Sequence, residues 1–91
     1  MIEVEKKNQN EFLVLLREKE TQSQHLVTLD NDYHYLLTQG KITKEDLVRK
    51  SFQFLLHRET KESILHSFDL QMIKQYFPEY EDEISSSIVE E

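Results

Sequence analysis

The chain has 91 residues, with 18 acidic residues against 11 Lys or Arg, and its formal net charge is −7. A chain of this length allows one domain, and its excess of acid argues against nucleic acid or an anionic membrane as a partner. The absence of cysteine excludes disulfides and thiolate metal sites and is typical of proteins from a reducing compartment. We therefore expect a soluble, cytoplasmic protein.

Neither a secretory signal nor a membrane span is expected. The N-terminal residues Met1–Glu5 are acidic, whereas a secretory signal begins with positive charge. The longest apolar run, Phe12–Leu16, is far too short to cross a bilayer. Residues 79–91 hold six acids and no base, which is typical of a solvated segment. We predict a flexible N-terminal arm over 1–10, a single α+β domain over 11–78 and an acidic, mobile C-terminal tail over 79–91.

Two segments are strand candidates. His25–Leu29 alternates, is rich in strand formers and stops at an Asp-Asn-Asp cluster. The continuous apolar run within 11–17 suits either a buried strand or a short helix. A lone strand leaves unpaired amides, so 25–29 pairs either with 11–17 or with a second copy of the chain. We favour the hairpin, although the intervening residues 18–22 lack the Gly or Asn that usually forms such turns.

The next segment predicts a short helix. Asp30 is placed as its N-cap, and Tyr33, Leu36 and Leu37 are expected on one face. Gly40 is the only glycine of the chain and follows where a helix C-terminus favours left-handed geometry.

A second, central helix is predicted over 43–58. Thr43 is its expected N-cap, Asp46 stands in the capping-box position, and Ile42 with Leu47 forms a hydrophobic staple. At about 100° per residue, the apolar arc of this helix is so broad that more than one side must be packed. The arc comprises Leu47, Val48, Ser51, Phe52, Phe54, Leu55 and Leu56.

The remaining chain predicts a turn from Thr60 through Leu65 and a last helix. Asp69 is its expected N-cap, and Pro78 ends it because proline disfavours helical geometry at the residue before it. The core is predicted to include Val27, Leu29, Leu36, Val48, Phe52, Leu55, Ile64, Ile73 and Phe77.

No motif predicts catalysis. The histidines form no His-x-x-x-His pair and no zinc signature, no serine stands in a Gly-x-Ser-x-Gly elbow, and one glycine cannot build a phosphate loop. We expect no enzyme activity, no catalytic residue, no cofactor and no metal.

Two clusters are candidate binding residues. Tyr76, Phe77 and Tyr80 either anchor a partner, beside acids that attract a basic surface, or fold back into the core. Lys44, Arg49 and Lys50 form a basic helix face that either contacts phosphates or is simply solvated.

Over 25–59, the order of strand, short helix and capped helix resembles the ribbon-helix-helix family of dimeric DNA-binding proteins. The resemblance implies that Gln24–Leu29 is a ribbon paired across a two-fold axis, with helices over 30–39 and 43–58. This ribbon departs from the pattern because it holds no Arg or Lys for reading bases.

Over 11–84, the chain is similar to a group of short bacterial proteins of unknown function. The similarity rests on Phe12–Leu16, Lys50–Leu56, Glu62–Leu65 and Tyr76–Tyr80. It implies a hairpin followed by helices and brings no active site.

We therefore expect an α+β fold with a two-stranded antiparallel hairpin followed by three or four short helices. The expected function is non-enzymatic protein interaction or self-association, with an unidentified protein or a second copy as partner. The alternative is a ribbon-helix-helix-like DNA-binding regulator.

Overall fold

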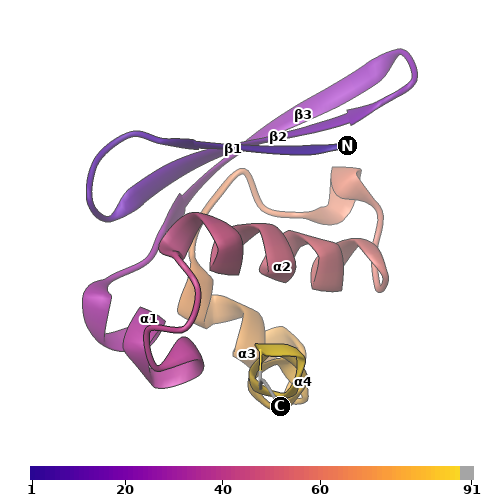
Figure 1. Ribbon diagram of the computed structural model, residues 1–91. Helices are drawn as coiled ribbons and strands as arrows, with labels where there is room; N and C mark the ends of the chain where they lie inside the picture. Colours follow the sequence, from indigo (N-terminus) through magenta and orange to yellow (C-terminus); the bar gives the residue numbers. More distant parts are fainter. Residues whose placement is uncertain (89–91) are drawn as a thin grey trace.

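The computed structural model describes residues 1–88, which form one four-stranded sheet with helices packed on one of its faces (Figure 1). The first three strands form an antiparallel meander, and the last strand is parallel to the third. The strands are β1 (Ile2–Lys6), β2 (Glu11–Glu18), β3 (Thr21–Thr28) and β4 (Ser67–Asp69). The helices are α1 (Asn31–Thr38), α2 (Lys44–Leu56), α3 (Ile73–Tyr76) and α4 (Tyr80–Ile88), with short 3-10 turns η1 (Lys61–Ser63) and η2 (Leu70–Met72). The predicted α+β class is confirmed.

The hairpin between β2 and β3 is present, but it is the centre of a larger sheet and not a two-stranded unit. Glu11 lies opposite Thr28, and Glu18 lies opposite Thr21. The turn therefore needs only two residues, and Lys19 adopts the positive φ of 50° that glycine usually supplies. The residues of the turn did not predict the hairpin. Pairing of the two long strands places one non-glycine residue, Lys19, in the left-handed region.

Residues 1–10 differ from the flexible arm predicted from the sequence. Within them, β1 pairs with β2, and Val4 lies opposite Val14. Ile2 and Val4 pack against the core, and Arg49 donates a hydrogen bond to the carbonyl of Ile2. The alternation of apolar and acidic residues in β1 is a strand pattern, and it is stable because β2 offers a free edge.

Helix α2 lies beneath the sheet at the centre of the molecule, as its broad apolar arc predicts (Figure 1). The side chain of Thr43 accepts a hydrogen bond from the amide of Asp46 at 3.0 Å, so the predicted cap is confirmed. The sheet packs on one side of α2, and α1 and α4 pack on the others. Its buried residues are Leu47, Val48, Ser51, Phe52, Phe54 and Leu55.

Helix α1 starts at the predicted cap but buries a different face from the expected one. Asp30 accepts a hydrogen bond from the amide of Tyr33 at 2.7 Å. Tyr33 and Leu37 are buried, whereas Leu36 is 63% exposed and is wrongly placed in the predicted core. Thr38 is buried as well. Around the helix axis Leu37 lies only about 40° from Tyr33, Thr38 lies beyond Leu37, and Leu36 lies on the other side of Tyr33, so the buried face is turned away from Leu36.

Most of the other predicted core residues are buried: Val27, Leu29, Val48, Phe52, Leu55, Ile64 and Ile73. Phe77 is half-buried against the core. Gly40 has the predicted positive φ, at 79°, but Gln39 before it is also left-handed, at 53°. The end of α1 therefore uses two left-handed residues where the sequence indicated one.

The acidic C-terminal segment also differs from its prediction. Helix α4 occupies Tyr80–Ile88 and buries Tyr80, Ile84 and Ile88, which recur every four residues and form one helix face. Between Tyr80 and Ile84, Asp82 and Glu83 are exposed and Glu81 is half-buried. Residues 89–91 of the predicted tail lie outside the described part of the chain.

Strand β3 has neighbours on both sides. It pairs with β2 along its whole length and with β4 over Leu26–Thr28, and the amide of Leu26 donates to the carbonyl of His66 at 2.8 Å. Both edges of this part of β3 are therefore used within the chain, and neither is available to pair with the same strand of a second copy. No helix of residues 1–88 is long and apolar enough to span a bilayer.

Candidate functional site

An apolar groove of about 360 Å³ opens beside the C-terminal end of α2. The chain after α2 turns through η1, runs into β4 and then forms η2 and α3, so that it encloses the groove from the remaining sides. We call this site the apolar groove. Its lining residues are Leu55, Glu59, Ser63, Ile64, Leu65, Phe68, Met72, Ile73, Tyr76 and Phe77.

Buried side chains make the floor of the apolar groove. Ile64 and Ile73 are each 3% exposed, and Leu55 is 4% exposed. Phe77 meets Phe54 edge to face, with ring centroids 5.8 Å apart. These contacts belong to the protein core, so the floor is rigid and its shape is set before any partner arrives.

Two large side chains stand at the groove with much of their surface in water. Leu65 is 48% exposed and Tyr76 is 63% exposed. Leu65 directly follows the buried Ile64, and Tyr76 stands three residues after the buried Ile73, at the end of α3. The carbonyl of Leu65 is also held by Nδ1 of His25 at 2.7 Å, so its backbone is anchored to β3. Exposed apolar side chains that gather at a concave site are typical of binding surfaces.

Glu59 carries the single charged side chain of the groove lining. Partial burial raises the pKa of its carboxyl group, and no opposing charge is among the causes of this shift. No ion pair involving Glu59 exists among residues 1–88.

The cations around the groove are all paired with other acids. Arg58, next to Glu59, bonds Glu79 at 3.0 Å and Glu83 at 2.9 Å, and its guanidinium lies 3.7 Å from the centre of the Phe54 ring. The ammonium of Lys74 lies 3.6 Å from the carboxylate of Glu81.

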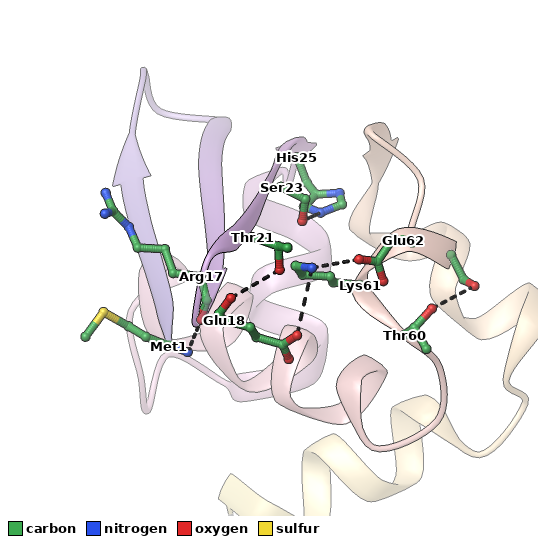
Figure 2. A network of polar contacts seen from close by, with 10 residues as sticks. Met1, Arg17, Glu18, Thr21, Ser23, His25, Thr60, Lys61 and Glu62 are labelled. Carbon is green, nitrogen blue, oxygen red and sulfur yellow. Dashed lines mark hydrogen bonds and ion pairs between the residues drawn. The ribbon is translucent and has the colours of Figure 1, made fainter.

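Lys61 is held in the polar network drawn in Figure 2. Its side chain is 4% exposed, and its ammonium pairs with Glu62 at 2.7 Å and with Glu18 at 3.8 Å. Both acids are more than half exposed. The network joins η1 to the end of the β2–β3 hairpin and so fixes one wall of the groove.

The predicted docking cluster is divided by the structure. Tyr76 and Phe77 both line the apolar groove, whereas Tyr80 is fully buried and its hydroxyl lies 2.6 Å from Oγ of Ser51. Tyr80 is therefore a core residue and cannot contact a partner. Helix α3 ends before Pro78 and α4 begins after it. Tyr76 and Phe77 therefore stay at the groove, whereas Tyr80 turns inward.

The predicted basic face is used largely within the chain. The ammonium of Lys44 donates to the carbonyl of Gln9 at 2.9 Å and to Oδ1 of Asn10 at 3.0 Å. Arg49 donates to the carbonyl of Ile2, and Lys50 is half-buried. Two of these cations therefore tie α2 to the β1–β2 hairpin.

Sequence reasoning missed a hydrogen-bonded Ser23–His25 pair on β3. Oγ of Ser23 lies 2.8 Å from Nε2 of His25. The carbonyl of Leu65 can only accept a hydrogen bond, so Nδ1 of His25 carries the proton, and Nε2 of the neutral ring accepts from Ser23. Two residues apart on a strand share one face, and this spacing was the signal that could have revealed the pair.

The Ser23–His25 pair has a packing role. His25 is fully buried, stacks on His66 with ring centroids 5.4 Å apart and contacts the ring of Phe52 at 5.6 Å. Neither residue lines the apolar groove. Burial lowers the pKa of His25, partly offset by its bond to Leu65. Over residues 1–88, no group of three metal-ligating side chains is present.

Sequence reasoning also did not place Glu59, Leu65 and Met72 at a site. Glu59 and Leu65 lie in two different loops and Met72 lies in η2, and no local spacing connects them. Comparison of the chain with protein-family models, curated proteins and solved structures found no match.

Proposed function

We propose that this protein is a non-enzymatic interaction module that docks another protein in the apolar groove. The observation that carries the proposal is the meeting of Leu65 and Tyr76 at one concave apolar site, although both are about half exposed or more. A folded domain gains nothing from leaving such side chains in water, whereas a partner that covers them gains the free energy of apolar burial.

The form of the groove supports a protein partner. Large side chains inserted into preformed apolar pockets are the usual anchors of protein interfaces. The buried floor of Leu55, Ile64 and Ile73 can receive such an anchor without rearrangement, which keeps the entropic cost of binding low. Tyr76 and Leu65 then cover the anchor and exclude water from its edges.

Charge favours a partner that is not a second copy. Each chain has a formal net charge of −7, and like-charged molecules repel at low salt. Self-association through the groove is the competing outcome and can be measured directly by light scattering.

The test compares two matched double variants in affinity capture and light scattering. Leu65→Ser with Tyr76→Ser changes the groove, and Tyr35→Ser with Leu36→Ser changes a chemically matched pair on α1 that is at least as exposed, at 64% and 63%. We expect a protein that is captured by the wild type and by the α1 variant and is lost with the groove variant. Equal capture by both variants, or no specific capture, would refute the proposal. A wild-type dimer that only the groove variant dissociates would indicate self-association instead.

A further inference from the structure

We propose that the segment bound in the apolar groove carries a Lys or Arg beside a large apolar side chain, with the cation seated against the carboxylate of Glu59. This inference rests on the proposed function, because it names the chemistry of the partner that the groove would hold.

The first step is the isolation of Glu59. A carboxylate among Leu55, Leu65 and Tyr76 has lost part of its hydration, and a hydrogen-bond donor or an opposite charge at this position would replace the lost hydration. The described part of the chain supplies no cation within 4 Å of it. The remaining residues 89–91 are Val-Glu-Glu and contain no cation either.

The second step is that the surrounding cations cannot easily be redirected. Arg58 is held by two carboxylates and stacks on a ring, and Lys61 is buried with its own acids. Moving either one to Glu59 would break existing pairs for one new pair, and moving Lys74 would break its pair with Glu81. A cation from a partner has no such cost, so an intermolecular pair is the favourable solution.

The third step is the environment of the incoming cation. Tyr76 borders the same groove and is 63% exposed, so a guanidinium or ammonium group can approach its ring. The nearby cations meet more acids than they can neutralise: Arg58 pairs with Glu79 and Glu83, Lys61 pairs with Glu18 and Glu62, and Lys74 pairs with Glu81. With Glu59 added, acids outnumber bases around the groove. The local potential is therefore negative, which raises the association rate of basic segments.

The experiment uses the full chain and a displayed library of random peptides about a dozen residues long. Peptides enriched on the wild type are sequenced, synthesised and measured against Glu59→Gln, against Glu5→Gln and against the Leu65→Ser, Tyr76→Ser groove variant. Glu5 lies on β1, at the opposite edge of the sheet from β4, and its substitution removes the same charge from the molecule.

We expect enriched peptides that combine Lys or Arg with Leu, Ile, Phe or Trp. Their affinity should fall about tenfold with Glu59→Gln, remain unchanged with Glu5→Gln and weaken with added salt for the wild type. Peptides without a base, or bound equally well by Glu59→Gln, would overturn the cation site while leaving the docking groove intact if the groove variant still loses them. Failure to enrich any peptide, or binding that the groove variant retains, would overturn both proposals.

Discussion

The hydroxyl of Tyr80 lies 2.6 Å from Oγ of Ser51, and this contact joins the start of α4 to the middle of α2 inside the core. Oγ of Ser51 already donates to the carbonyl of Leu47 at 2.8 Å. The hydrogen bond to Ser51 must therefore come from Tyr80. Burial raises the pKa of Tyr80, which keeps its hydroxyl protonated as a donor.

Substitutions of Tyr80 should separate this hydrogen bond from packing. Tyr80→Phe should lower the free energy of unfolding by about 1 kcal/mol, because it removes one buried hydrogen bond. Tyr80→Ala should cost about 3–5 kcal/mol, since it also leaves a cavity beneath α4. Urea denaturation measures both, with Tyr76→Ala as the exposed control that changes stability by less than about 1 kcal/mol. Similar losses for Tyr80→Ala and Tyr76→Ala would show that α4 is not packed as described.

Arg49 should stabilise β1 through its bond to the carbonyl of Ile2. Arg49→Met keeps much of the apolar stem but removes this charge-assisted hydrogen bond, so stability should fall by about 1–2 kcal/mol. Amide hydrogen exchange should accelerate in Ile2–Lys6 more than in β2 or β3. Lys50→Met changes the same charge on the next residue and is the control. Unchanged exchange in β1 would contradict the anchoring role of Arg49.

His25 should make the protein sensitive to mild acid. Its pKa is lowered by burial from the usual value of 6.5, so the unfolded chain takes up a proton at a higher pH than the folded one. The contribution of His25 to the free energy of unfolding is therefore complete above pH 6.5. It decreases as the pH falls from 6.5 toward the lower pKa of the folded state. The lowered pKa values of Glu62 and Glu79 act in a separate window, below their usual 4.5.

The pH effect can be assigned by substitution. Denaturation between pH 7 and 5 should show a loss of stability in the wild type and in His57→Gln, which changes an exposed histidine. His25→Gln should lack this slope, whatever its stability at pH 7. NMR titration of the His25 ring should give a midpoint below 6.5, and a midpoint above 6.5 would reverse the sign of the predicted effect.

The stability of the protein should respond differently to removal of the Lys61 charge and of the Glu62 charge (Figure 2). Lys61→Met leaves Glu18 and Glu62 exposed to water, so neither acid becomes a buried charge. Glu62→Gln leaves a 4% exposed ammonium with its remaining acid 3.8 Å away. We therefore expect Glu62→Gln to lower the thermal midpoint more than Lys61→Met, because an unpaired buried charge costs more than a lost surface pair. The reverse order would mean that the ammonium reaches water.

Residues close in sequence made several features predictable. Thr43 with Asp46, and Asp30 with Tyr33, form caps within one helical turn. The apolar arc of α2 follows from helix periodicity alone. Tyr76 and Phe77 were recognised as candidates because aromatic residues cluster there. The role of Tyr80 could not be read from the same cluster, because it depends on the turn at Pro78 and on the position of Ser51 in another helix.

The sequence by itself determined the α+β class and the two capped helices, since caps and hydrophobic periods act over a few residues. It favoured the β2–β3 hairpin but left pairing with a second copy open. Only the tertiary structure decided that Ile2–Lys6 becomes a strand and that the segment after Pro78 packs as α4, because each requires a distant surface to cover it. The apolar groove is also a tertiary feature. Within residues 1–88 no cation pairs with Glu59, because Arg58, Lys61 and Lys74 each meet another acid in space. Three-dimensional proximity, not spacing along the chain, decides which charges pair.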